Sequence, residues 1–265
     1  MDTSDFFALH PVFSLDEAHR ELAPSSERPG TVARLKYHLS SGRLKLVTRG
    51  VYAVVPAGVT PADFRPDPLL VAAAARPDAI FAYHSALELL GTAQSAWNRC
   101  TVYTSRRRPR LLLDRGDVLF FDDPLPLRAT DRRRLGTRRV ERRGRLLEVT
   151  GPERALVDGL RKPPLAGGLE ELVQSAAAFP ALDLELLHAV LTCFGTARLW
   201  AATGWFLERF QQTYSVSDDF LAELELRRPR SVQYLERAQR GGTLHSRWNL
   251  VLPDSGDELS AADER

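Results

Sequence analysis

Residues 31–55 read TVARLKYHLSSGRLKLVTRGVYAVV, and this stretch decides the fold of the N-terminal part of the chain. Val32, Leu35 and Leu39 follow the i, i+3, i+7 spacing of one helix face, so they predict a helix with a single buried stripe. Thr31 stands at its start, and threonine is a favoured N-cap residue. We therefore expect a helix that begins after Thr31.

The second half of the stretch predicts a β-hairpin. Gly42 can adopt the left-handed conformation that ends a helix. Two apolar runs follow, Leu44–Val47 and Val51–Val55, and both are typical of short strands. Residues 48–50 form the tight turn between them, where Gly50 can supply a positive φ.

Two further helices are expected upstream of this stretch. Asp5–Leu9 is a short apolar helix candidate. Ser14 and Glu17 form a capping box, which predicts a second helix that runs to about Leu22. A turn then leads to the third helix, and five turn-forming residues indicate it: Pro24, Ser25, Ser26, Pro29 and Gly30. Helix, helix, turn, helix and hairpin is the order of a winged helix-turn-helix, which we assign to residues 1–57.

The exposed face expected for the third helix is basic and polar. No Asp or Glu lies between Arg28 and Gly50. Side chains that could reach base edges or the backbone in a major groove are Thr31, Arg34, Lys36, Tyr37, His38 and Ser41. Side chains that could neutralise phosphates are Arg28, Arg43, Lys45 and Arg49. These ten residues predict binding to double-stranded DNA. Two alternatives stay open: an ordinary solvated basic face, and a Tyr37 that packs on the wing without touching DNA.

The remainder of the chain predicts a mixed α/β domain over residues 68–253. A Pro-rich connection at 55–68 separates it from the N-terminal module. Strands are expected near 79–83, 100–104, 118–121 and 146–149, and helices at 68–75, 84–91, 152–160, 168–179, 183–194, 196–213 and 217–226. Thr150 and Glu153 suggest a capping box, and Gly241-Gly242 suggests the turn of a closing hairpin. The expected fold class is α+β.

The charges are unevenly distributed, although the net charge of the 265 residues is only +2. A second basic run covers residues 128–145, and it either extends a DNA contact or forms a solvated surface. The segment 254–265 is acidic, and we expect a flexible tail. The N-terminus lacks a signal-peptide pattern and no apolar run could span a bilayer, so a cytoplasmic protein without membrane association is expected. Cys100 and Cys193 are far apart in sequence and are expected as thiols.

Four blocks of sequence resemble the AbiEi family of antitoxins. Val47-Thr48-Arg49-Gly50-Val51-Tyr52-Ala53 resembles the family's Arg-Gly-Val-Tyr wing signature. Residues 81–91, FAYHSALELLG, resemble its His-x-Ser-Ala-Leu-x-Leu-x-Gly block, and residues 150–158, TGPERALVD, resemble its Pro-Glu-Arg-Thr-Leu-x-Asp helix start. Gly167-Gly168 with Glu170-Glu171 fits a further family feature. The blocks occur in the family's order, with Ala155 at a position where threonine is common.

The resemblance implies an antitoxin of a type IV toxin–antitoxin pair. In that family the winged helix represses its own operon at inverted repeats in the promoter. The C-terminal domain counters a nucleotidyltransferase-like toxin without a stable complex. Stand-alone relatives also occur, so a winged-helix regulator without a toxin is the alternative.

Enzyme classes are disfavoured by missing residues. A restriction-type nuclease needs a Glu-x-Lys element beside its acids, but no Lys lies between positions 46 and 161, so Asp122-Asp123 is expected as a strand-ending turn. A nucleotidyltransferase needs a Gly-Ser dipeptide, which the chain lacks. His84 with Ser85 is in no nucleophile elbow, so a buried, hydrogen-bonded histidine is expected. His38 has no second ligand spaced with it. We expect no catalytic residues, no metal and no cofactor.

Overall fold

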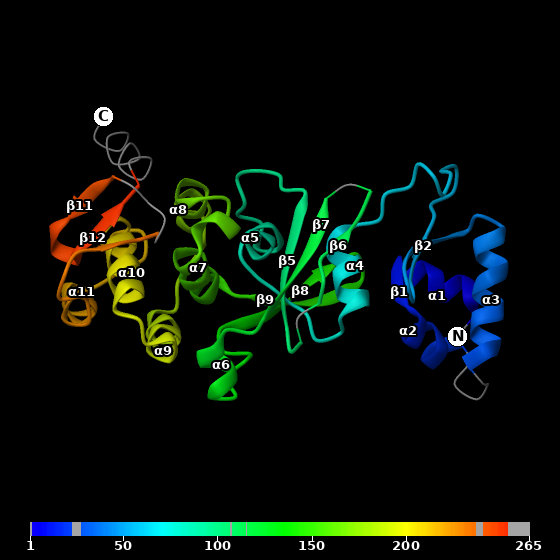
Figure 1. Cartoon of the computed structure of the whole chain (residues 1–265), viewed down its shortest axis with the longest axis horizontal. Coiled ribbons are helices and arrows are strands. Elements are labelled where there is room, and N and C mark those ends of the chain that lie inside the picture. The colour runs from blue at the N-terminus through cyan, green and yellow to red at the C-terminus, as the bar shows by residue number, and fades with distance from the viewer. Residues whose placement is uncertain (1, 23–27, 107, 115, 237–240, 254–265) are drawn as a thin grey trace. The chain divides into compact units, whose positions relative to one another are not determined.

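The computed structural model describes residues 2–22, 28–106, 108–114, 116–236 and 241–253, and it has the expected α+β class (Figure 1). The chain divides into two compact units. The first contains residues 1–80, 98–121 and 139–148, and the second contains residues 81–97, 122–138 and 149–265. The Pro-rich connection at 55–68 therefore lies inside the first unit, and the predicted tail 254–265 lies outside the described residues.

The first unit begins with six elements in the order helix, strand, helix, helix, strand, strand. They are α1 (Thr3–Leu9), β1 (Val12–Ser14), α2 (Leu15–Leu22), α3 (Arg28–Ser40), β2 (Leu44–Thr48) and β3 (Val51–Val54). The three strands form an antiparallel sheet in the order β1-β3-β2. Strand β1 is an addition to the predicted order. With only three residues between a helix and a helix cap, it carries too short an alternation to predict a strand.

The predicted capping box at the start of α2 is confirmed. The Ser14 amide donates to Glu17 Oε2 at 2.7 Å, and the Glu17 amide donates to Ser14 Oγ at 3.1 Å. Gly42 and Gly50 have φ values of +73° and +77°, as the two turns require. In contrast, the prediction that Thr31 caps the third helix is wrong. Helix α3 begins at Arg28 and includes Pro29, which is tolerated in a first helical turn.

The sheet of this N-terminal module is covered on both sides. On one side a core of buried residues joins the helices to the sheet: Phe6, Phe7, Phe13, Ala18, Leu35, Leu44 and Tyr52. On the other side Val12, Val51 and Ala53 pack against Leu70 and Val71 of α4 (Pro68–Ala75). Strand β3 is therefore buried on both faces, which explains why its sequence is apolar throughout rather than alternating.

A six-stranded sheet has the order β6-β7-β5-β4-β9-β8. Its strands are β4 (Ile80–Phe81), β5 (Arg99–Thr104), β6 (Leu111–Leu112), β7 (Asp117–Asp122), β8 (Thr137–Arg142) and β9 (Arg145–Thr150). Strands β4, β5, β7 and β9 were predicted. Strand β8 was not, because half of its sequence TRRVER is arginine and Val140 is its one apolar residue, so no apolar side reveals it.

Helices dominate the second unit. They are α5 (His84–Leu90), α6 (Leu125–Ala129), α7 (Pro152–Arg161), η1 (Pro163–Leu165), α8 (Leu169–Ala177), α9 (Leu184–Phe194), α10 (Ala197–Arg209) and α11 (Asp218–Leu226). Helix α7 is buried over almost its full length, with α8, α9 and α10 packed around it. None of the helices in the described ranges is both long and apolar enough to cross a bilayer.

Two local predictions in this unit are wrong. Thr150 lies in β9, and the N-cap of α7 is Gly151, so the predicted capping box does not form. The Glu153 carboxylate instead accepts from the Asp183 amide at 2.9 Å. The final strands β10 (Gln233–Tyr234), β11 (Thr243–His245) and β12 (Leu250–Leu252) have the order β10-β12-β11. Gly241-Gly242 lies between β10 and β11 in the sequence, but these two strands are separated in the sheet by β12 and do not pair. The two glycines therefore do not form the turn of a hairpin.

Candidate nucleic-acid interface

Helix α3 has one buried side and one exposed side. Thr31 and Leu35 face the core, and Leu39 packs against it. The exposed side is centred on Ala33, Tyr37 and Ser40, which follow the i, i+4, i+7 spacing of a single stripe. Tyr37 is 69% exposed and is the one large side chain of that stripe. Ala33 and Ser40 were not singled out from the sequence. A prediction that starts the helix at Arg28 and places Leu35 at the centre of its buried side would have found them.

Two of the predicted contact residues point inward. Thr31 is 1% exposed, and its hydroxyl lies 2.9 Å from Nδ1 of His19 on α2. His38 is half-buried and makes an edge contact with the Phe7 ring, 5.0 Å between centroids. Burial, with help from the positive charges of Arg43 and Arg34, lowers the pKa of the His38 imidazole, which favours its neutral form. Both residues hold α3 on the module, and Thr31 does not lie on the exposed face.

Three predicted arginines are exposed but have partners inside the module. Arg28 forms an ion pair with Asp16 of α2. Arg34 donates to the Leu22 carbonyl at 3.3 Å. Arg43 donates to Ser4 Oγ at 3.2 Å, and its guanidinium lies over the Phe7 ring. Only the first of these partners carries a negative charge, so Arg34 and Arg43 keep their positive charge at the surface.

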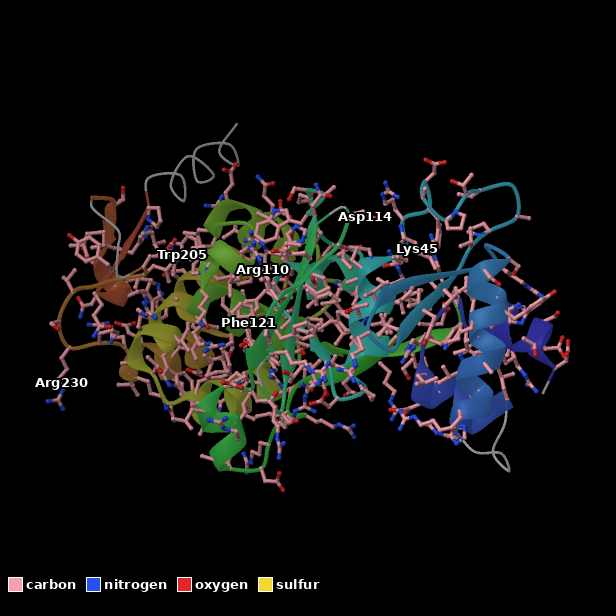
Figure 2. All side chains as sticks on the ribbon, turned by 45° about the vertical axis from the view of Figure 1, so that its right-hand side comes forward. Lys45, Arg110, Asp114, Phe121, Trp205 and Arg230 are labelled. Atoms are coloured by element: carbon pink, nitrogen blue, oxygen red, sulfur yellow. The ribbon has the colours of Figure 1, made fainter. Side chains whose placement is uncertain are left out.

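Lys45 differs from the other basic residues because its ammonium forms an ion pair and a hydrogen bond within the fold. Its ammonium donates to Asp114 Oδ2 at 2.7 Å and to the Phe64 carbonyl at 2.9 Å, and its side chain is 20% exposed. Lys45 and Asp114 are labelled in Figure 2. In contrast, Lys36 and Arg49 are exposed and form no ion pair or side-chain hydrogen bond with any described residue. Ser41 is exposed at the end of α3, where its hydroxyl donates to the His38 carbonyl.

The exposed surface of the module therefore combines a helix and a turn. The helix contributes Arg34, Lys36, Tyr37 and Ser41, and the β2–β3 turn contributes Arg49. No carboxylate comes from residues 28–62. This surface can offer hydrogen-bond donors and positive charge to a polyanion, and its small residues allow the helix backbone to approach closely.

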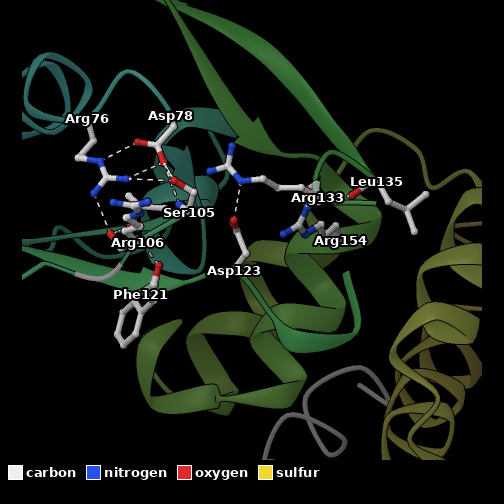
Figure 3. Close-up of polar contacts among 10 residues, drawn as sticks. Arg76, Asp78, Ser105, Arg106, Phe121, Asp123, Arg133, Leu135 and Arg154 are labelled. Atoms are coloured by element: carbon white, nitrogen blue, oxygen red, sulfur yellow. Dashed lines mark hydrogen bonds and ion pairs between the residues drawn. The ribbon is translucent and has the colours of Figure 1, made fainter. Parts of the chain in front are cut away.

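Part of the second basic run, residues 128–145, is structural. Four of its arginines hold carboxylates: Arg133 with Asp123 at 2.6 Å, Arg139 with Glu148 at 3.7 Å, Arg142 with Asp67 at 2.9 Å and Arg145 with Glu17 at 2.6 Å. Figure 3 shows Arg133 directed at Asp123, and Arg154 near Leu135. Arg154 is fully buried, and it donates to the Arg133 carbonyl at 2.6 Å and to the Leu135 carbonyl at 3.1 Å. These four arginines form ion pairs within the fold, an outcome that neither interpretation of the sequence included, and the choice between a DNA contact and a solvated surface stays open for the other five.

The residues weighed for catalysis occupy structural positions. Strand β7 ends at Asp122, and Asp123 accepts from Arg133, as expected for a strand-ending turn. His84 is 1% exposed, as predicted, and stacks on the Trp97 ring at 4.7 Å. Its Nε2 lies 3.3 Å from Ser95 Oγ and 3.5 Å from Glu171 Oε1. Burial lowers the pKa of the His84 imidazole. Within the described ranges no group of three or more His, Cys, Asp or Glu side chains could hold a metal ion.

The blocks of sequence that resemble the antitoxin family meet in two places. Residues 47–53 form the β2–β3 turn and its flanks. The other blocks meet in the second unit, where His84 faces Glu171, and the Tyr83 hydroxyl accepts from Arg161 at 2.7 Å. Tyr83 has a φ of +56°, an uncommon conformation for a non-glycine residue, at the start of α5. Most of these residues are buried, so the blocks describe a core rather than an exposed site.

No protein-family model matches the chain, and no curated protein matches it. Among solved structures, the chain is similar to the crystal structure of the RV2827C protein from Mycobacterium tuberculosis, with a TM-score of 0.63 and 17% sequence identity. The match covers 98% of this chain and 93% of that chain. At this identity the likeness shows a shared fold over nearly the full length.

Proposed function

We propose that residues 1–57 form a winged helix-turn-helix that binds double-stranded DNA, and that the protein is a transcriptional repressor. The observation that carries the proposal is the exposed side of α3, which has Tyr37 at its centre, Arg34 and Lys36 beside it, and no carboxylate. A helix of this kind fits the major groove, where its polar side chains meet base edges. The order of the six elements, with the third helix followed by a hairpin, supports the same assignment.

The contacts divide by chemistry. Tyr37 and Ser41 lie where base edges would be met, and Arg34 can turn from the Leu22 carbonyl to a base or a phosphate. Lys36 and Arg49 have no acidic partner among the described residues, so a phosphate would be their first counter-charge. Lys45 is excluded from this set because Asp114 already neutralises it. The interface is therefore smaller than the ten residues that the sequence alone suggests.

The resemblance to AbiEi antitoxins extends the proposal. On that basis the protein represses its own operon at inverted repeats and counters a nucleotidyltransferase-like toxin without a stable complex. This part rests on the sequence blocks alone, whereas DNA binding rests also on the geometry of α3. We assign the protein a binding role and no catalytic one, with no cofactor.

The test is a fluorescence-anisotropy titration of the full chain with the duplex upstream of its own gene, at several salt concentrations. The wild type should bind that duplex more tightly than an unrelated one. Arg49→Ala should weaken binding to both duplexes and reduce the salt slope by about one unit. Tyr37→Ala should weaken binding mainly to the specific duplex. Arg230→Ala, an exposed arginine in the second unit without an acidic partner among the described residues, is the charge-matched control and should bind like wild type.

If the wild type fails to bind either duplex at micromolar concentration, the proposal is wrong. If it binds but Arg49→Ala and Tyr37→Ala have no effect, DNA contacts another surface. Co-expression with a nucleotidyltransferase encoded beside this gene separates the antitoxin from a stand-alone regulator, because only the antitoxin should restore growth.

A further inference from the structure

A groove at the edge of the six-stranded sheet lies apart from α3. It is lined by Arg108, Pro109, Arg110, Leu119, Phe120 and Phe121, and it has a volume of about 610 Å³. The segment before β6 forms one wall and strand β7 forms the other. Strands β6 and β7 pair through only two residue pairs, Leu111 with Val118 and Leu112 with Asp117. Pro109 has no backbone N–H and so cannot donate to a continued ladder. Arg110 of the first wall and Phe121 of the second are labelled in Figure 2.

The first wall carries positive charge that the fold does not cancel. Arg106, Arg108 and Arg110 are all exposed within five residues. Arg108 donates to the Ala75 carbonyl at 3.4 Å and has no acidic partner among the described residues. Arg110 lies 3.6 Å from Asp117, whose side chain is only 12% exposed and is shared with Arg99 at 3.4 Å. The guanidinium groups thus outnumber the single covered carboxylate.

The second wall is apolar and aromatic. Leu119 and Phe121 are half-buried, and both line the groove. Phe120 is 5% exposed and anchors the strand in the sheet. A volume of this size lies in the range of ordinary ligand pockets, about 300–1,000 Å³.

We propose that this groove binds single-stranded nucleic acid. The planar guanidinium groups of Arg108 and Arg110 match phosphate oxygens, and the Phe121 ring and Leu119 offer an apolar surface to an unpaired base. A duplex satisfies the arginines but keeps its bases stacked away from Phe121. An acidic peptide likewise satisfies the arginines and leaves the apolar wall without a role. The combination of both walls therefore favours an unpaired strand. This inference does not depend on DNA binding by α3.

The test uses the full chain and fluorescein-labelled dT12, with anisotropy measured from 50 to 200 mM salt. The double variant Arg108→Ala/Arg110→Ala should bind at least tenfold more weakly. Its salt slope should fall by about 0.7–1.4, since each neutralised phosphate of a single strand contributes about 0.7 and Arg110 shares the Asp117 carboxylate with Arg99. Phe121→Leu keeps an apolar side chain but removes the ring, and it should weaken binding about fivefold or more with little change in salt slope.

Two control variants, a second oligonucleotide and a check of folding make the outcome decisive. Arg143→Ala/Arg230→Ala removes the same charge from exposed positions outside the groove and should bind like wild type. Arg34→Ala/Arg49→Ala should keep its affinity for dT12, so a failure of the proposal for α3 is distinguishable from a failure here. A parallel titration with labelled rU12 decides between DNA and RNA as the preferred strand. Thermal melts of each variant show whether it is folded.

Two results would overturn the proposal. One is dT12 and rU12 binding that is absent, or unchanged in the folded Arg108→Ala/Arg110→Ala variant. The other is a labelled oligoglutamate that binds as tightly, with the same dependence on Arg108 and Arg110 and none on Phe121. That result would identify the occupant as an acidic peptide.

Discussion

The sequence and the structure predict different roles for Thr31. By sequence it lies at the start of the third helix, where it would meet DNA. In the structure it is 1% exposed, and its hydroxyl lies 2.9 Å from His19 Nδ1. Thr31→Val keeps the branched shape and removes only the hydroxyl. Because Thr and Val have similar helix propensities, the change isolates one hydrogen bond between α2 and α3.

A hydrogen bond of this kind contributes about 0.5–1.5 kcal/mol to stability. His19 is half-exposed and can be rehydrated, so we expect the free energy of unfolding to fall by about 1 kcal/mol, without a larger penalty for a buried unpaired group. A lost base contact would instead weaken DNA binding by about 1–3 kcal/mol, which is roughly 5- to 150-fold. The structure thus predicts a stability change with no change in affinity.

The assay has two parts, urea unfolding and anisotropy titration with the promoter duplex, on the same protein preparations. Thr31→Val should shift the urea midpoint and leave the m-value unchanged, with an affinity within about twofold of wild type, well below the effect of a lost base contact. Tyr37→Ala is the reciprocal control because its side chain is 69% exposed, so it should lose affinity and keep its urea midpoint. A tenfold loss of affinity in Thr31→Val with an unchanged unfolding curve would refute the assignment of Thr31 to the core.

Further predictions follow from other contacts. Gly204→Ala in α10 should destabilise the protein by about 1–3 kcal/mol in urea unfolding, because the added Cβ would lie 2.1 Å from the buried Trp248 ring. Gly to Ala in a helix usually stabilises by about 1 kcal/mol, so a gain in stability would contradict this packing. Arg154→Met should cost about 3 kcal/mol, since it removes one of the two guanidinium groups 3.4 Å from the buried Asp158 carboxylate, the other being that of Arg161, and also the donor to two backbone carbonyls. A urea midpoint within error of wild type would rule this out. Burial lowers the pKa of His84 in the folded chain, so the contribution of neutral His84 to stability is present above about pH 6.5, its ordinary pKa, and is lost as the pH falls below that value. In His84→Gln the urea midpoint should therefore decline less between pH 7 and pH 5 than in the wild type. An equally steep decline in the variant would contradict this role of His84. Lys45→Ala should leave the salt slope of DNA binding unchanged because Asp114 already holds the ammonium, in contrast to Arg49→Ala; a slope reduced by about one unit would return Lys45 to the interface.

Much of the secondary structure could be predicted because helices with capping boxes and strands with apolar runs leave clear local patterns. Ser14 with Glu17 is such a case, and so is the turn at Gly50. The failures have equally local causes. Thr31 is a good N-cap type, but the chain extends the helix one turn earlier, and the hydroxyl instead bonds across to α2. Strand β8 carries arginines on a sheet surface and has no apolar period. Partners distant in sequence, such as Asp114 for Lys45, 69 positions apart, leave no local pattern at all.

The same limit governs how arginine-rich sequence is interpreted as an interface. The run at 128–145 is denser in arginine than residues 28–49, and on density alone it would be the better polyanion site. Four of its arginines are held by Asp67, Asp123, Glu148 and Glu17, carboxylates that lie between 9 and 128 positions away. Their charge is cancelled within the fold, and releasing it would cost an ion pair for each phosphate gained. Within residues 28–49 only Arg28 and Lys45 form ion pairs with carboxylates. Arg108 at the edge of the sheet has no acidic partner among the described residues. Five exposed arginines of the run keep no acidic partner among the described residues, namely Arg128, Arg132, Arg134, Arg138 and Arg143, against four basic residues of 28–49. Ion pairing thus reduces the advantage of the run from three basic residues to one, so arginine content alone overstates a surface for a polyanion.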